Sequence, residues 1–312
     1  MSLFPSFLCT GIEKNKALMK SIRILVILLS AFAVHISAVA QTDDAQRRWE
    51  MQLDTGRVNP LRAEYLHLEK DIVLEEFNKQ PNFGMYKDNY FITGVPTNKS
   101  IDSRTADAKF QLSIRQRLFN TVMPFNTQLM LIYTQQSFWN IYEESSPFAD
   151  NNYNPGLLLI KPVIDNNRLK GMATISFEHE SNGKDSLESR SWNYVTLSGI
   201  YFHNSIISIQ AKVWYGWVDS ETSTLFDYKG YGMVALNYRG LRNGLGASLV
   251  INPSRKAVNT RLEFTYQPNR NANQYLFVQW YQGYGESLLE YDRYTSMVRV
   301  GISIRAPMRS LY

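Results

Sequence analysis

Hydrophobic and polar residues alternate with a period of two along most of the chain after residue 88. The pattern is most regular between residues 205 and 218, where apolar residues occupy every second position. The apolar series is Ile207, Ile209, Ala211, Val213, Tyr215 and Trp217, and the polar series is Ser208, Gln210, Lys212 and Gly216. Successive side chains of a strand point to opposite faces, so this alternation predicts a half-buried β-strand.

The same pattern predicts twelve strands. They begin near Asn89, Lys109, Thr127, Gly156, Lys170, Ser189, Ser205, Tyr231, Gly246, Asn259, Gln274 and Tyr294. The links between them alternate in length: residues 124–126, 165–168, 203–204 and 241–244 form short links, whereas 96–108, 143–154, 182–188, 219–229 and 252–258 form longer, polar ones. Short turns at one end, long loops at the other and an even strand number are typical of transmembrane barrels. We therefore predict an all-β fold, a twelve-stranded antiparallel transmembrane β-barrel of the outer membrane, over residues 81–312.

The first forty residues have the features of an export signal. A basic region is followed by an apolar run and by small residues, which are Lys14, Lys16, Lys20 and Arg23, then Ile24 to Val34, then Ala38, Val39 and Ala40. This order is typical of a secretory signal peptide, and the run is shorter than the roughly 20 residues that a membrane helix needs. We predict cleavage after residues 1–40, with Met19 as an alternative start, and a polar N-terminal segment over 41–80 whose stretch 63–79 favours a helix.

Removal of this signal changes what composition and charge imply. The whole chain carries a formal charge of +5, and its first forty residues hold four Lys or Arg and one Glu, so the remainder carries +2. The single cysteine, Cys9, is removed as well. A disulfide framework or a cysteine metal cluster is therefore not expected, and the small charge gives no reason to expect a nucleic-acid partner.

Two neighbouring predicted strands bring polar residues onto otherwise apolar faces. One face carries Ile175, Phe177, His179 and Ser181, and the matching face of the next strand carries Asn193, Val195, Leu197 and Gly199. Apolar faces of a membrane barrel look towards lipid, so His179, Ser181 and Asn193 should meet on the lipid-facing wall. A serine activated by a histidine that a third group orients is the arrangement of a hydrolase. The other interpretation is that these are ordinary polar residues at the membrane rim.

A neutral orienting group suits such a wall. Asparagine can accept the imidazole N–H without a negative charge, whereas a carboxylate at the bilayer centre costs about 3 kcal/mol.

Six short segments of the chain are similar to segments of a known family. They are Lys109–Ser113, Tyr133–Ser137, Glu144–Phe148, His179–Gly183, Ser189–Asn193 and Gly283–Leu288. In this order, over about residues 80–312, they resemble the outer-membrane phospholipase A family.

The resemblance implies a calcium-dependent enzyme, a carboxylic ester hydrolase that cleaves acyl esters of phospholipids. It implies hydrolysis at sn-1 and sn-2 and of lysophospholipids, with activity in a homodimer of the outer membrane. It also implies Ser181 as nucleophile, His179 as base and Asn193 as orienting group. The corresponding Ca²⁺ ligands are the Ser189 side chain, the Lys184 carbonyl, the Ser145 carbonyl of a second copy, and an acidic residue that is Glu221 or Asp219.

Gln135 matches the family position that forms a hydrogen bond across the dimer. The chain also departs from the family pattern, because Ser186 stands where the family has an aspartate and the acid here is Asp185. Three alternatives stay open: a catalytically inactive barrel acting as a pore or structural protein, an outer-membrane protease, and a soluble exported lipase built on a β-sandwich. The protease would want more histidines than the three that remain after residue 40.

Overall fold

The computed structural model describes residues 69–121, 123–218, 220–240, 244–269 and 273–305. The predicted signal peptide and residues 41–68 lie outside these ranges. The chain divides into two compact units, Met1–Asn59 and Pro60–Tyr312, and every described residue belongs to the second. Among the described residues, no helix combines the length and the apolar character needed to cross a membrane.

Twelve antiparallel strands close into a barrel, as the period of two predicts. Each strand pairs with the next along the chain, and the last pairs with the first of the twelve, which closes the ring. The strands are β2 (Asn89–Pro96), β3 (Asp107–Arg117), β4 (Gln128–Trp139), β5 (Phe148–Asp165), β6 (Arg168–Ser181), β7 (Ser191–Phe202), β8 (Ile207–Val218), β9 (Gly232–Arg239), β10 (Leu245–Pro253), β11 (Val258–Tyr266), β12 (Gln274–Gly283) and β13 (Thr295–Ile304). Closure gives each strand two neighbours for its backbone hydrogen bonds, which a wall in lipid requires.

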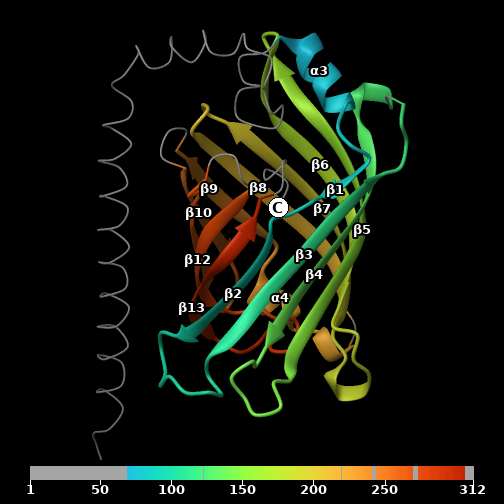
Figure 1. Cartoon of the computed structure of the whole chain (residues 1–312). Helices are drawn as coiled ribbons and strands as arrows, with labels where there is room; N and C mark the ends of the chain where they lie inside the picture. Colours follow the sequence, from blue (N-terminus) through green and yellow to red (C-terminus); the bar gives the residue numbers. More distant parts are fainter. Residues whose placement is uncertain (1–68, 122, 219, 241–243, 270–272, 306–312) are drawn as a thin grey trace, which may run out of the picture. The chain divides into compact units, whose positions relative to one another are not determined.

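Five short elements and one longer helix complete the described fold. They are α3 (Lys70–Asn78), β1 (Phe83–Met85), η3 (Pro124–Asn126), η4 (Ser186–Glu188), η5 (Ser220–Thr222) and α4 (Leu225–Lys229). β1 and β2 pair with the same side of β3, with a break between them. The long links gather at one end of the barrel, and α3 lies at the opposite end (Figure 1).

One strand boundary was wrong in the sequence interpretation. β5 begins at Phe148, whereas the prediction placed its start near Gly156 and treated 143–154 as a loop. The other eleven strands begin within two residues of their predicted starts. The residues that misled the prediction are Asp150, Asn152 and Asn154, which are buried on the lumen side of β5. Polar residues on a barrel's inner face have the composition of a loop, so composition alone could not separate the two.

The outer face of the wall is mostly apolar, and the inner face is mostly polar. On β8, the exposed side chains include Ile209, Val213, Tyr215 and Trp217, whereas Gln210 is fully buried. On β6, Ile175 and Phe177 are exposed and Ser176 and Glu178 are buried. The predicted parity is confirmed, because apolar side chains face outward and polar ones face the lumen.

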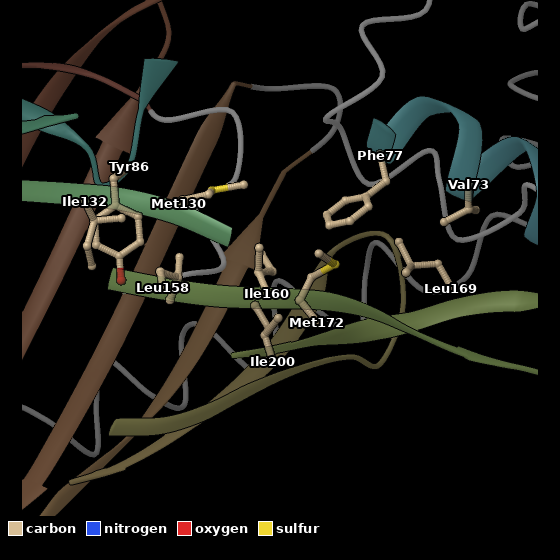
Figure 2. Close-up of a cluster of buried hydrophobic side chains, with 10 residues drawn as sticks. All are labelled: Val73, Phe77, Tyr86, Met130, Ile132, Leu158, Ile160, Leu169, Met172 and Ile200. Carbon is tan, nitrogen blue, oxygen red and sulfur yellow. The ribbon is translucent and has the colours of Figure 1, made fainter. Parts of the chain in front are cut away.

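The helix α3 packs on an apolar cluster at the end of the barrel where the short turns lie. Its Val73 and Phe77 point towards lumen residues of β4 to β7, including Leu169 and Met172 (Figure 2). Barrel side chains also bind the end of the helix: Gln128 Nε2 donates to the Phe77 carbonyl at 2.7 Å, and Arg117 Nη1 donates to the Asn78 carbonyl at 2.7 Å. These donors satisfy carbonyls that the last helical turn leaves without partners.

Candidate active site

His179 and Asn193 face each other directly across the β6–β7 ladder. The imidazole Nδ1 lies 2.9 Å from the Asn193 Oδ1, so an Nδ1–H can donate to the amide oxygen. The backbone N–H of Asn182 donates to the Arg190 carbonyl at 3.0 Å, towards β7. Backbone groups alternate in direction along a strand, so those of His179, three residues earlier, point towards β5. His179 and Asn193 therefore form a pair without ladder hydrogen bonds, the pair type that brings side chains closest.

Ser181 ends β6 on the same outward face as His179. It stands opposite Ser191 on one side and Tyr153 on the other. Residues two apart on a strand are separated by about 7 Å along it, so Ser181 and His179 are neighbours along one face of β6. Ser181, His179 and Asn193 are all half-buried, so the three predicted residues lie together at the lipid-facing rim.

The lumen side of the same strand holds a buried carboxylate. Glu178 is fully buried and accepts hydrogen bonds from the Ser176 hydroxyl at 2.7 Å and the Tyr194 hydroxyl at 3.0 Å. Lys212 Nζ lies 3.9 Å from the same carboxylate. Gly156, across the ladder, has no side chain because a Cβ there would lie 2.8 Å from the Glu178 Cγ. The negative charge of β6 is thus held on the inner face, directly behind the outward site.

The loop after Ser181 is folded around one buried amide. Asn182 is 4% exposed, and its Oδ1 accepts the backbone N–H groups of Lys184 at 3.3 Å and Arg190 at 3.0 Å. Its Nδ2 donates to the Glu188 carbonyl at 2.7 Å. The Lys184 ammonium donates to the Glu188 carboxylate at 2.9 Å, and this hydrogen bond lowers the pKa of Glu188. The amide therefore fixes the start, middle and end of the loop.

Two of the predicted Ca²⁺ ligands lie in this loop. Lys184 follows Gly183, whose φ of +67° allows the chain to turn at the end of β6. Ser189 follows η4, and its backbone N–H donates a hydrogen bond to the Ser186 carbonyl at 3.1 Å. Arg190 Nη1 donates to the carbonyls of Leu187 and Ser189 at 2.8 and 2.7 Å. Those two carbonyls already have a cationic partner, whereas the two predicted donors of the loop, the Lys184 carbonyl and the Ser189 hydroxyl, are different groups.

The other two predicted ligands come from different loops. Ser145 is exposed in the link between β4 and β5. Glu221 lies in η5, where the structure describes the backbone but not this side chain, and Asp219 lies outside the described residues. The Thr222 hydroxyl donates to the Ser191 carbonyl at 2.8 Å, which brings η5 beside the start of β7. Within the described ranges, no three His, Cys, Asp or Glu side chains gather as a metal site.

Gln135 belongs to the outward series of β4, as its parity predicts, and is half-buried. It accepts a hydrogen bond from the Tyr133 hydroxyl at 3.2 Å and donates to the Ser137 hydroxyl at 3.1 Å. Its amide therefore has partners within its own strand. The dimer contact of Gln135 stays a prediction.

Asn182 and Asn154 support the site, but sequence reasoning gave neither a role. Asn154 donates to the backbone carbonyl of His179 at 2.9 Å. A signal for it was available, because the Asn154-Pro155 dipeptide interrupts a strand pattern, and a proline removes a ladder donor that a neighbouring side chain can replace. No such local signal exists for Asn182, whose three partners lie across a folded loop.

Comparison with known proteins agrees with the barrel and its outer-membrane setting. Residues 68–304 match the model of the family described as phospholipase A1. The phospholipase A1 of Escherichia coli K12 is 30% identical over 211 residues, which cover 65% of this chain and 71% of that protein. A putative phospholipase A1 of Neisseria meningitidis is 28% identical over 245 residues, 72% of this chain. The chain spans 61% of the length of the Neisseria protein.

Solved structures of outer-membrane phospholipases have the same fold. The outer membrane phospholipase A of E. coli matches with a TM-score of 0.64 and 25% identity, over 72% of this chain and 99% of that one. A Salmonella typhi outer membrane phospholipase, crystallised as a dimer with bound calcium, matches with a TM-score of 0.66 and 24% identity, over 76% and 98%. This chain therefore belongs to the phospholipase A1 family and is an outer-membrane phospholipase.

Proposed function

We propose that this phospholipase cleaves sn-1 and sn-2 esters and lysophospholipids through Ser181, His179 and Asn193, with Ca²⁺ and as a homodimer. The observation that carries the proposal is the 2.9 Å contact between His179 Nδ1 and Asn193 Oδ1. It occurs on the outward face of the barrel wall, two residues from a serine. Structural packing alone gives no reason to place a His, a Ser and an Asn together on a lipid-facing surface.

The acylation step uses the second ring nitrogen of His179. Asn193 accepts the Nδ1–H and so keeps Nε2 unprotonated and available to the Ser181 hydroxyl. Ser181 Oγ bonds to the ester carbonyl carbon while its proton moves to Nε2. The ester C–O bond then breaks, the leaving alcohol takes that proton, and the lysophospholipid departs from an acylated Ser181.

Deacylation repeats the proton transfers with water. His179 Nε2 removes a proton from a water molecule whose oxygen bonds to the acyl carbon. The bond to Ser181 Oγ breaks, the serine recovers its proton from His179, and the fatty acid leaves. Asn193 stays neutral throughout, which suits a site whose surroundings include Phe177 and Val195, both exposed on the same face. The substrate reaches this face from the membrane without passing through the lumen.

The oxygen donors beside this site fit a calcium ion. The candidates are a serine hydroxyl at Ser189, a backbone carbonyl at Lys184 and a carboxylate at Glu221, and hard oxygen ligands suit Ca²⁺. The buried amide of Asn182 holds the loop with the first two. When bound, Ca²⁺ supplies positive charge that stabilises the oxyanion of the tetrahedral intermediate. Ser145 of a second copy is the proposed fourth donor, which makes the site depend on dimerisation.

The test is a fatty-acid release assay on the full-length enzyme in mixed micelles of detergent and diacyl phospholipid. We expect release with Ca²⁺ and its loss in excess chelator. Ser189→Ala should raise the Ca²⁺ concentration needed for half-maximal rate, whereas Ser100→Ala, at an exposed serine of another long loop, should not. Equal rates with and without Ca²⁺ would show that the metal part of the proposal is wrong.

Dimerisation has a separate test. Chemical crosslinking in the same micelles should give a dimer band whose intensity rises with Ca²⁺ and follows the rate of fatty-acid release. Full activity in preparations that contain only monomer by crosslinking and by light scattering would contradict the dimer part. The inactive-pore alternative predicts ion conductance in planar bilayers with no Ser181-dependent hydrolysis.

A further inference from the structure

A proline interrupts the β5–β6 ladder directly opposite His179. The register pairs Tyr153 with Ser181. Counting two residues along each strand places Pro155 opposite His179. Proline has no backbone N–H, and the backbone groups of His179 point towards β5. The His179 carbonyl therefore lacks the ladder donor that any other residue at position 155 would supply.

Asn154 supplies the missing donor from its side chain. It is 6% exposed on the lumen face of β5, and its Nδ2 donates to the His179 carbonyl at 2.9 Å. The same Nδ2 donates to the Tyr194 hydroxyl at 3.0 Å, and Tyr194 donates in turn to the Glu178 carboxylate at 3.0 Å. Buried carbonyls are almost always paired, so this amide fixes the β6 backbone at His179 from the lumen side.

We propose that Asn154 is a positioning residue for His179, an inference that rests on the function proposed above. The place of the imidazole is set by two anchors, its own backbone and the Nδ1 contact with Asn193. With both in place, Nε2 is held towards Ser181. Loss of the backbone anchor lets β6 shift at His179, and misplacement of a reacting group by about 1 Å costs up to about 100-fold in rate.

Asn154→Ala removes this donor and leaves Pro155 in place. We expect kcat to fall about 10-fold to 100-fold and KM to change less than about twofold, because the substrate-facing surface is untouched. Asn152→Ala is the matched control. It also removes a buried lumen amide of β5, 3% exposed, but that amide donates to Asp150 and not to His179. Its kcat should stay near the wild-type value.

A second substitution tests the geometry. Asn154→Ala combined with Pro155→Ala returns a backbone N–H opposite His179, so kcat should recover most of the loss. A purely structural role for Asn154 does not predict this rescue. The proposal is overturned if the double variant is as slow as Asn154→Ala, or if Asn152→Ala is equally slow.

Imidazole ¹⁵N chemical shifts, assigned with a His179→Ala spectrum, give a readout that does not need turnover. The Nδ1 and Nε2 shifts of His179 should move in Asn154→Ala, stay unchanged in Asn152→Ala, and return in the double variant. If the wild type releases no fatty acid but the shifts follow this pattern, the proposed function fails and the positioning role stands. Unchanged shifts in Asn154→Ala overturn the positioning role whatever the activity.

Discussion

The two faces of β6 hold polar residues in opposite ways. Facing lipid, the His179 imidazole and the Asn193 amide form one hydrogen bond at 2.9 Å, beside the exposed apolar side chains of Phe177 and Val195. Facing the lumen, Glu178 is charged and is surrounded by hydroxyls and by Lys212. The Glu178 charge lies where partners compensate for its burial, whereas His179 and Asn193 lie among apolar neighbours that offer no such compensation.

A second lumen cluster shows how strongly the inner face depends on pairing. Arg299 is 2% exposed and donates to Asp107 through two hydrogen bonds of 2.7 Å and to Glu286 at 2.7 Å. Lys109 Nζ donates to the same Glu286 carboxylate at 3.0 Å. We therefore expect substitutions of the outward polar residues at His179 to change rates and substitutions in this lumen cluster to change stability.

Ser181→Ala should have the largest effect. Removal of the proposed nucleophile leaves His179 and Asn193 without a group to activate, so the rate of fatty-acid release should fall at least about 1000-fold, or about 4 kcal/mol in barrier height. The variant should keep the wild-type unfolding midpoint in denaturant, because the hydroxyl lies at the end of a strand. Substantial release by purified Ser181→Ala would contradict the mechanism.

Arg299→Met should have the largest effect on stability. It leaves the buried Glu286 carboxylate and the half-buried Asp107 carboxylate without their main partner, and breaking such a cluster costs about 3 to 5 kcal/mol. Urea unfolding in micelles measures this loss. Arg293→Met, at an exposed pair with Glu290, is the control, since surface ion pairs contribute little, about 0 to 1 kcal/mol. Equal losses of unfolding free energy in the two variants would mean that the lumen cluster contributes no more to stability than an exposed ion pair.

Ile175→Arg tests the other side of the comparison. Ile175 is exposed at the middle of β6, and an arginine on the lipid face at mid-membrane costs about 2 to 4 kcal/mol. Ile175→Val keeps the face apolar and should cost much less. Unfolding in lipid bilayers, with folded and unfolded barrels separated by heat-modifiable gel mobility, gives both values. No difference between them would place this face away from lipid.

Acid should weaken the lumen cluster through Glu286. Burial alone would raise the pKa of Glu286, but Arg299 and then Lys109 overcome this and hold it at about 2, below its usual value of 4.5. A lowered carboxyl pKa stabilises the fold above pH 4.5, and this stabilisation is lost as pH falls from 4.5 towards 2. The free energy of unfolding should fall by up to about 3 kcal/mol over this pH range. In Glu286→Gln, it should change less with pH over the same range.

The strand pattern could be predicted because one face of the wall must be apolar. This constraint placed His179, Ser181 and Asn193 on one surface from parity alone. It failed at the start of β5, where Asp150, Asn152 and Asn154 face the lumen and look like loop residues. Asp150 accepts the backbone N–H groups of Leu288 and Leu289 at 3.1 and 2.9 Å, across about 138 residues of sequence. No local pattern encodes so distant a partner.

The Ca²⁺ ligands were predicted through resemblance, and their arrangement depends on loop folding that periodicity cannot describe. Lys184 and Ser189 share one loop because the buried side chain of Asn182 closes it. A loop held by side-chain hydrogen bonds has no period. The residue types alone indicated oxygen donors, and only the structure shows which carbonyls, those of Leu187 and Ser189, are already engaged by Arg190.

Asn193→Ala should have the smallest effect of the series, because it removes orientation but not a reacting group. His179 then loses the acceptor for Nδ1–H, and the productive tautomer is no longer favoured. We expect kcat to fall about 10-fold to 100-fold, or about 1.4 to 2.7 kcal/mol, with KM nearly unchanged. Initial rates over a range of phospholipid concentrations at saturating Ca²⁺ measure both constants.

Asn193→Asp sharpens this last prediction, since it keeps an oxygen acceptor in the same place but adds a charge. If orientation alone mattered, this variant would match or exceed the wild type, because a carboxylate accepts the Nδ1–H more strongly than an amide oxygen. On a lipid-facing wall the added charge carries a desolvation cost, so we expect a rate between those of the wild type and Asn193→Ala. A rate above the wild type would mean that the outer face at His179 is far more hydrated than its apolar neighbours indicate.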